Sequence, residues 1–161
     1  MTRHIDFEMR FDLPPERLVG VMTDPAFLEW EAVQQGSFRA TCVDQERTEQ
    51  RVSLRLDQVG PNHDPRTRAK ETRFSIHYDW DVAAGSCEWH RTAERDDGVR
   101  IGGRHRITAQ AGGSRYTMHW ELTIGIPVLG RVMEKKVDGE IRKGAQRRER
   151  FLRQWLAEHP G

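Results

Sequence analysis

Hydrophobic and polar residues alternate one by one along most of the chain, beginning at its start. In residues 3–12 the apolar positions are Ile5, Phe7, Met9 and Phe11, with charged residues or histidine between them. This period of two predicts a β-strand with one buried and one solvated face. The same alternation predicts six further strands at 37–44, 48–58, 70–81, 86–95, 98–110 and 114–124. Turn-forming residues separate most of these segments, so we expect antiparallel hairpins.

Two short helices are predicted directly after the first strand. Pro14 and Pro15 suit a first helical turn, and Asp24 before Pro25 is typical of the N-cap of a second helix. The buried side of that second helix is expected to consist of Phe27, Leu28, Trp30 and Val33. Beyond residue 127 the apolar period becomes helical, in a stripe formed by Leu129, Met133, Val137, Ile141, Gly144, Ala145, Phe151, Leu152 and Trp155. The stripe predicts one long C-terminal helix.

Length and composition favour one domain of a protein that stays in the cytoplasm. The chain has 161 residues without a linker or repeat, so we expect residues 1–161 to form a single domain. No run approaches the roughly 18 apolar residues of a membrane span, and the first residues lack the apolar stretch of a secretory signal. Cys42 and Cys87 are too few for a disulfide scaffold and fit a reducing compartment.

The order of elements resembles the START-like superfamily, which includes START lipid carriers, Bet v 1-type plant proteins, polyketide cyclases and coenzyme Q-binding proteins. Residues 13–19 (LPPERLV) and 23–30 (TDPAFLEW) are similar to its opening, in which a Thr-Asp-Pro turn joins the short helices. Residues 126–134 and 155–159 resemble an uncharacterised bacterial START-like family. The resemblance implies an α+β helix-grip fold: a curved antiparallel sheet of about seven strands, two short helices after the first strand, and one long C-terminal helix across the sheet. It implies no catalytic residue.

Aromatic residues dominate the face of the sheet that the alternation turns toward the long helix. A curved sheet lined by such rings leaves a ligand pocket of roughly 300–1,000 Å³, unless the rings simply fill the core; the resemblance favours the pocket. Phe38 is also assigned to this inward face. The residues expected to bind a ligand are Tyr78, Trp80, Trp89, Arg91, His105, Tyr116, Met118, Trp120, Met133, Val137, Ile141, Gly144 and Arg148.

Three polar residues on these apolar faces need an explanation, because buried polar groups require partners. Arg91 and His105 fall on the inward side of their strands, and Arg148 falls within the helical stripe. Either arginine could hold an anionic group of an apolar ligand, with His105 as a hydrogen-bonding or acid/base group. Alternatively, each reaches water or pairs with a carboxylate such as Glu49 or Glu121.

Gly144 interrupts the apolar stripe of the long helix. Glycine costs roughly 1 kcal/mol of helix propensity relative to alanine, so its place on a packed face needs a reason. Either the helix approaches a bulky residue of the sheet there, or the position leaves space for a ligand.

Other functional classes lack support in the sequence. The chain has 26 basic and 25 acidic residues and a net charge of +1, which gives no field to attract DNA. The sequence contains no Gly-x-Ser-x-Gly nucleophile elbow, no glycine-rich phosphate-binding loop and no Cys-x-x-Cys motif. No cofactor and no catalytic residue is therefore assigned. His77, His90 and His119 fall on the outer face, and no two of them have the spacing of a local metal site.

The long helix is strongly basic on its solvated side, where Arg142, Lys143, Arg147, Arg150 and Arg153 lie. Such a face could make transient contact with RNA, an acidic protein or an anionic membrane. It could equally be a solvated face that complements the negative end of the helix dipole.

The sequence thus predicts a protein that binds or transports a small hydrophobic molecule, such as a lipid or polyketide-like compound with an anionic group. The first alternative is a cyclase or aromatase that uses polar residues of the pocket. The second is an interaction module that uses the basic helix.

Overall fold

The computed structural model describes residues 2–64, 66–125 and 130–161, with only the backbone for residues 130, 131, 133 and 134. The elements are β1 (Thr2–Phe11), α1 (Pro15–Met22), α2 (Pro25–Gln34), β2 (Arg39–Arg47), β3 (Arg51–Pro61), β4 (Glu71–Asp81), β5 (Ser86–Ala93), β6 (Val99–Gln110), β7 (Gly113–Ile124) and α3 (Gly130–Glu158). Asp24 caps α2 by accepting a hydrogen bond from the backbone N–H of Ala26 at 2.9 Å, as the sequence predicted.

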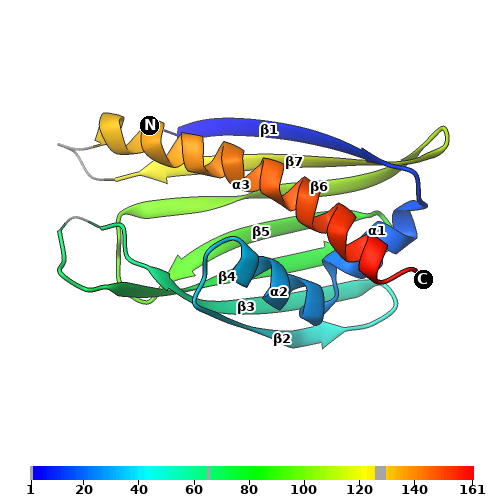
Figure 1. Cartoon of the computed structure of the whole chain (residues 1–161), viewed down its shortest axis with the longest axis horizontal. Helices are drawn as coiled ribbons and strands as arrows, with labels where there is room; N and C mark the ends of the chain where they lie inside the picture. The colour runs from blue at the N-terminus through cyan, green and yellow to red at the C-terminus, as the bar shows by residue number, and fades with distance from the viewer. Residues whose placement is uncertain (1, 65, 126–129) are drawn as a thin grey trace.

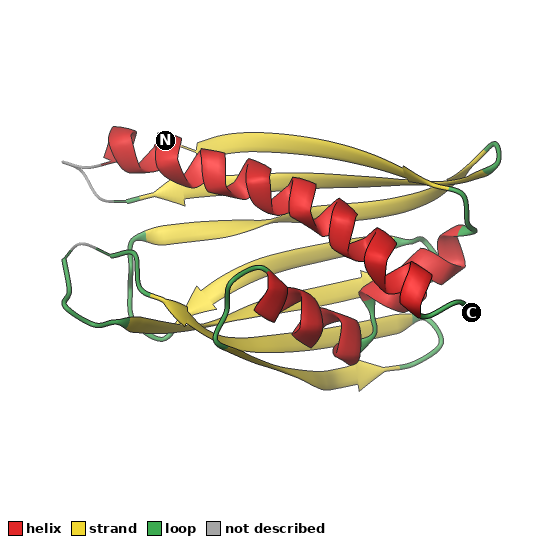
Figure 2. Cartoon of the chain, viewed as in Figure 1, coloured by secondary structure: helices red, strands yellow, loops and turns green. Residues whose placement is uncertain are grey.

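The strands form one seven-stranded antiparallel sheet with the order β1-β7-β6-β5-β4-β3-β2. The chain therefore runs back and forth from β2 to β7 and then places β7 beside β1. α3 crosses the sheet diagonally, and α1 and α2 lie on the same face (Figure 1). Colouring by secondary structure shows the three helices over one side of the curved sheet and the other side bare (Figure 2). The predicted helix-grip fold is confirmed.

The start of β2 differs from the prediction. The paired strand begins at Arg39 rather than at residue 37, and Phe38 is 56% exposed instead of inward. The chain leaves α2 through Gly36 at φ +118°, and the pairing with β3 begins at Arg39 opposite Val59. Phe38 therefore precedes the part of the edge strand whose alternation is fixed by the sheet.

The buried face of α2 also differs from the prediction. Phe27 and Leu28 are buried as expected, but Val33 is 46% exposed and Glu31 is buried in its place. Glu31 follows Leu28 by three residues and Phe27 by four, which puts it on the same side of the helix. Residue type favours Val33 for the buried face, but helical spacing places Glu31 there.

The apolar stripe of α3 packs onto the sheet. Ile141, Ala145, Phe151 and Leu152 are buried as predicted. Leu129 lies outside the described residues, and so does the side chain of Met133. None of the helices formed by the described residues combines the length and the apolar character needed to cross a bilayer.

Candidate ligand-binding cavity

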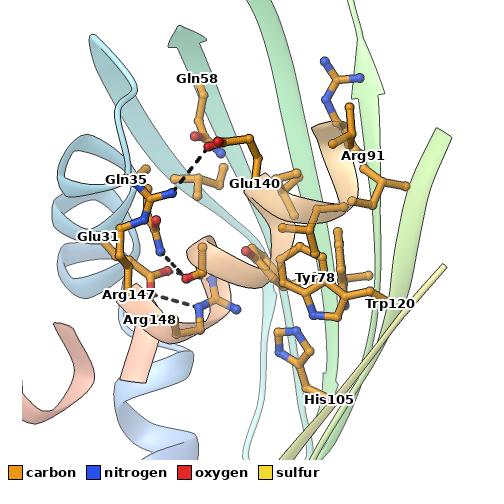
Figure 3. Close-up of a pocket in the computed structure, with 18 of the residues that line it drawn as sticks. Glu31, Gln35, Gln58, Tyr78, Arg91, His105, Trp120, Glu140, Arg147 and Arg148 are labelled. Atoms are coloured by element: carbon orange, nitrogen blue, oxygen red, sulfur yellow. Dashed lines mark hydrogen bonds and ion pairs between the residues drawn. The ribbon is translucent and has the colours of Figure 1, made fainter. Parts of the chain in front are cut away.

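A cavity of about 780 Å³ lies between the sheet, α2 and the middle of α3. Figure 3 shows side chains from these three sides converging on it. The lining residues are Glu31, Ala32, Gln35, Leu56, Gln58, His63, Ile76, Tyr78, Trp89, Arg91, Ile101, His105, Trp120, Lys136, Val137, Glu140, Ile141, Gly144, Arg147 and Arg148. The volume falls within the range typical of small-molecule sites.

Two tryptophans in the cavity wall pack against each other. Trp89 on β5 and Trp120 on β7 meet edge to face, with ring centroids 5.2 Å apart. Aliphatic side chains of Leu56, Ile76 and Ile101 line the cavity as well. This part of the wall is therefore aromatic and aliphatic.

A buried ion pair joins α2 to α3 at the cavity wall. Arg148 donates from Nε and Nη2 to the two carboxylate oxygens of Glu31, at 2.9 and 2.6 Å, and the side chains are only 11% and 4% exposed. Burial works to lower the pKa of Arg148, but the Glu31 carboxylate, together with Tyr116 and Tyr78, holds that pKa well above its ordinary value. The partner carboxylate thus comes from α2, and neither Glu49 nor Glu121 supplies it.

Arg91 is held by a carboxylate too. It donates from Nη1 and Nη2 to Asp97 at 3.2 and 2.6 Å, and its guanidinium lies 4.9 Å from the ring centroid of Phe74. Both inward arginines are therefore charge-paired within the protein. The third nitrogen of the Arg148 guanidinium, Nη1, does not contact Glu31 but lies 3.8 Å from the sulfur of Met118.

His105 contributes to the cavity wall a neutral imidazole with one nitrogen that has no described partner. Its Nδ1 is hydrogen-bonded to the hydroxyl of Tyr116 at 2.8 Å, while Nε2 is buried and lacks a partner among the described residues. Burial and, secondarily, the charge of Arg148 hold the pKa of His105 well below its ordinary value. Nε2 is thus a hydrogen-bond donor or acceptor according to which way the Tyr116 hydroxyl is oriented.

Tyr78 adds a hydroxyl to the same wall. Burial raises its pKa to about 12, against the opposing effect of the nearby Arg148 charge. Its ring centroid lies 6.3 Å from that of His105. The hydroxyl therefore stays protonated at neutral pH and is available as a hydrogen-bond donor.

The structure brings most of the sequence-predicted site residues together. Those that line the cavity are Tyr78, Trp89, Arg91, His105, Trp120, Val137, Ile141, Gly144 and Arg148. Trp80, Tyr116 and Met118 are buried but do not line it, because they pack behind the wall. The side chain of Met133 lies outside the described part of the chain. That these residues bind a ligand stays a prediction.

Sequence reasoning missed the contributions of α2, β3 and the exposed side of α3. Glu31 comes from α2 and Gln35 is the C-cap of that helix, whereas Gln58 comes from β3 and Lys136, Glu140 and Arg147 come from α3. The helical spacing of Phe27, Leu28, Glu31 and Gln35 was a usable signal for α2. No periodicity distinguishes Gln58 or Glu140 from ordinary surface residues.

Gly144 borders the cavity and leaves space there. A Cβ atom at this position would lie 3.9 Å from Oε1 of Gln35 and would approach no other described residue within 4 Å. Gln35 instead donates from Nε2 to the Gly144 carbonyl at 2.9 Å. The interpretation in which a bulky residue of the sheet approaches Gly144 is therefore wrong.

The basic side of α3 is largely compensated by acidic neighbours. Arg142 pairs with Asp138 at 3.0 Å, and Arg153 pairs with Glu149 at 3.0 Å. Glu140 lies 3.5 Å from Lys143 and 3.7 Å from Arg147. This compensation weakens the case for an anionic macromolecule, although contact of this face with RNA or an anionic membrane stays an untested prediction.

Comparison with solved structures identifies proteins of the same architecture. TTHA0849 from Thermus thermophilus gives a TM-score of 0.69 at 16% identity and covers 99% of this chain and 100% of that chain. Norcoclaurine synthase from Thalictrum flavum, solved in complex with dopamine and hydroxybenzaldehyde, gives 0.67 at 11% identity over 100% and 90%. The Zhui aromatase/cyclase from Streptomyces sp. R1128 gives 0.63 at 11% identity over 90% and 87%.

At these identities the likeness shows the fold, which is the helix-grip fold of Bet v 1-like and polyketide cyclase-like proteins. No curated protein sequence matches the chain at a significant level. Residues 6–156 match the model of a family described as a protein of unknown function, DUF2505, and the chain therefore belongs to that family.

Proposed function

We propose that the cavity binds a small, largely apolar molecule that carries a hydrogen-bonding group at one end. The observation that carries this proposal is the cavity of about 780 Å³ whose wall combines Trp89 and Trp120 with His105, a residue whose buried Nε2 has no partner among the described residues. A buried polar nitrogen without a partner loses its hydrogen bond to water on folding. A ligand with a carbonyl or hydroxyl group at that point would restore the bond.

The charges of the wall favour an anionic group at the mouth of the cavity rather than in its depth. The deeper Arg148 already has Glu31 as its counter-ion. At the exposed side of α3, Lys136 and Arg147 line the cavity and Glu140 is the acidic residue beside them. An amphipathic lipid or polyketide-like molecule, with its apolar body against the tryptophans, fits this distribution.

A carrier or sensor role has the stronger support. Catalysis by proton transfer needs a titrating group within reach of the substrate, and His105 is the histidine that meets this condition in depth. Its pKa is held well below the ordinary value, so at neutral pH it cannot act as a general acid. It can still act as a weak base, and a base that accepts a proton from an acidic polyketone is the second candidate.

Ligand binding can be tested with a pair of aromatic probes of nearly the same shape, the neutral N-phenyl-1-naphthylamine and the anionic 1-anilinonaphthalene-8-sulfonate. We expect the emission of both probes to rise saturably, with energy transfer from tryptophan. The melting temperature should increase with probe concentration, because a ligand of the native state stabilises it by mass action. Absence of binding by either probe, with the melting temperature unchanged, would contradict the proposal.

Single tryptophan variants locate the probe. Trp120→Phe, in the cavity wall, should reduce the energy transfer strongly. Trp30→Phe is the matched control, because Trp30 packs against Phe27, Phe151 and Trp155 outside the cavity lining. Equal losses in the two variants would place the probe elsewhere on the protein.

The carrier and enzyme roles are separated by His105→Gln, which keeps a polar side chain of similar bulk. A carrier should retain probe binding within a few-fold. If a polyketone substrate is turned over and this variant loses roughly 100-fold in rate with binding intact, the enzyme is the correct function.

A further inference from the structure

The outer face of the sheet, opposite the cavity, carries a cluster that the proposed function does not use. His4 on β1 and His119 and Glu121 on β7 place Nδ1, Nε2 and a carboxylate oxygen within 4.8 Å of one another. The pairing register produces this cluster, because His4 lies opposite Glu121 and Asp6 lies opposite His119. All four side chains point away from the helices, since the alternate residues Ile5, Met118 and Leu122 are buried.

We propose that His4, His119 and Glu121 form a binding site for a divalent transition-metal ion of the zinc type. The three ligand atoms lie 3.3 Å (His4 Nδ1 to His119 Nε2), 3.6 Å (His119 Nε2 to Glu121 Oε1) and 4.0 Å (His4 Nδ1 to Glu121 Oε1) apart. Ligands of tetrahedral zinc, bound at about 2.0–2.1 Å, are separated by roughly 3.3 Å. The point about 2.1 Å from all three atoms lies in their plane, so a tetrahedral zinc ion requires the widest separation, His4 Nδ1 to Glu121 Oε1, to shorten by roughly 0.7 Å, which a rotation of the exposed Glu121 side chain can supply.

Asp6 supports the site by holding one of the ligands. Its carboxylate lies 2.6 Å from Nδ1 of His119, which fixes the proton of that ring on Nδ1. The Nε2 lone pair, which accepts a hydrogen bond from Nδ1 of His4 at 3.3 Å in the metal-free chain, would bind the metal in its place. Carboxylate–histidine–metal arrangements of this kind orient the ring and strengthen it as a ligand. His4 must then carry its proton on Nε2 when its Nδ1 binds the ion.

The donor set and its charge define the cation. Two imidazole nitrogens and one carboxylate suit zinc, nickel or copper rather than magnesium or calcium, which prefer oxygen ligands. Asp6 and Glu121 supply negative charge, whereas Arg104, which is paired with His119 in the β6–β7 register, is the basic residue beside them. Three protein ligands leave one tetrahedral position for water. Bound metal would cross-link the edge strand β1 to β7.

The same face offers an internal control. His77 and His90 also lie opposite each other on neighbouring strands, and their rings stack with centroids 4.7 Å apart. Among the described residues this second pair belongs to no cluster of three metal-ligating groups. The cysteines are weak competitors, because burial raises the pKa of both Cys42 and Cys87 to about 12.

The test uses the full chain, freed of metal with EDTA and exchanged into buffer, and titrated with Zn²⁺ in competition with a chromophoric chelator. We expect one Zn²⁺ per chain with a dissociation constant below about 100 µM, and a melting temperature that rises with Zn²⁺ but not with Mg²⁺. His119→Ala should weaken binding by about 100-fold or more, and Asp6→Asn by about 10- to 100-fold. Co²⁺ should give the visible absorption of a tetrahedral site in the parent chain.

His90→Ala is the matched variant and should bind Zn²⁺ as the parent does. The proposal is overturned if the parent chain binds no Zn²⁺ in this range, or if His90→Ala loses as much affinity as His119→Ala. All substituted side chains are at the sheet surface, and circular dichroism in the absence of metal checks that each variant is folded. Probe binding in the cavity should be the same in all of these variants.

Discussion

The two ends of the sheet's inner face differ in how far side chains fill the space under α3. On β3, Leu54 is completely buried while Leu56, two residues further along the same face, lines the cavity. β4 repeats the change, because Trp80 is completely buried and Tyr78 lines the cavity. On both of these strands the sheet thus passes from a packed region to a hollow one within two residues.

The helices account for this difference. Over the packed region, α2 and the C-terminal part of α3 contribute Phe27, Trp30, Phe151 and Trp155, whose ring centroids lie 5.5–6.2 Å from their neighbours. Over the hollow region lie Gln35, the C-cap of α2, and Gly144 of α3. The cavity therefore depends on the small and polar residues that the helices place above it, while the sheet beneath is mainly aromatic and aliphatic, with Gln58, Arg91 and His105 as its polar lining residues.

The largest expected effect compares a tryptophan in each region. Trp80→Ala should lower the free energy of unfolding by about 3–5 kcal/mol, because it leaves a void in a closed core. Trp120→Ala should cost less than about 2 kcal/mol, since its side chain already borders an open space. Urea denaturation measures both, and equal costs would mean that the two regions are packed alike.

The next largest effect concerns the ion pair at the boundary of the cavity. Glu31→Gln leaves the buried guanidinium of Arg148 without its counter-charge and should cost about 3–5 kcal/mol. Glu31→Leu combined with Arg148→Met removes both charges and should recover most of that loss. If the double variant is as unstable as the single one, the cost comes from packing rather than from the uncompensated charge.

The sequence predicts the strands and their buried faces, but it does not predict which part of the buried face is packed and which part is hollow. Alternation predicted all seven strands, because a sheet with one buried face imposes a period of two on every strand. It also placed Trp89, Trp120 and His105 on the inner face. It could not separate Trp80 from Tyr78, which share one face and differ only in what the helices place above them.

The contacts within the ion pair and within the outer histidine cluster could not be predicted from the sequence either. Arg148 was recognised as anomalous, but its partner Glu31 lies 117 positions away on another helix. His4 and Glu121 meet through the β1–β7 register, and local spacing rules hold no information about it. Such contacts depend on how distant elements pack together. The sequence can therefore identify unusual residues, but not the residues that they contact.

A smaller effect depends on pH and reports on the burial of His105. The pKa of His105 is held well below 6.5 in the folded state, so as the pH falls through about 6.5 the unfolded chain takes up a proton that the folded chain does not. The free energy of unfolding must then fall with decreasing pH. Between about pH 7.5 and 5.5, the parent should lose about 1.4 kcal/mol more than His105→Gln.

This difference between the two proteins isolates the histidine, since all other titrating groups are common to both. Denaturation series at several pH values measure it. Parallel pH profiles for parent and variant would show that His105 titrates normally and is in contact with water.

The smallest expected change in stability accompanies a large change in binding, and it tests the hollow region directly. Gly144→Leu replaces a helix-weakening residue at a position where an added Cβ meets no clash, so the free energy of unfolding should change by less than about 1 kcal/mol. The leucine side chain should nevertheless occupy part of the cavity and abolish saturable binding of N-phenyl-1-naphthylamine. Gly139→Leu is the matched control, because Gly139 is in the same helix, an added Cβ there has no described neighbour within 4 Å, and Gly139 does not line the cavity. If both variants bind the probe as the parent does, the space beside Gly144 is not the binding site; if Gly144→Leu instead unfolds the protein, that space is part of a packed core.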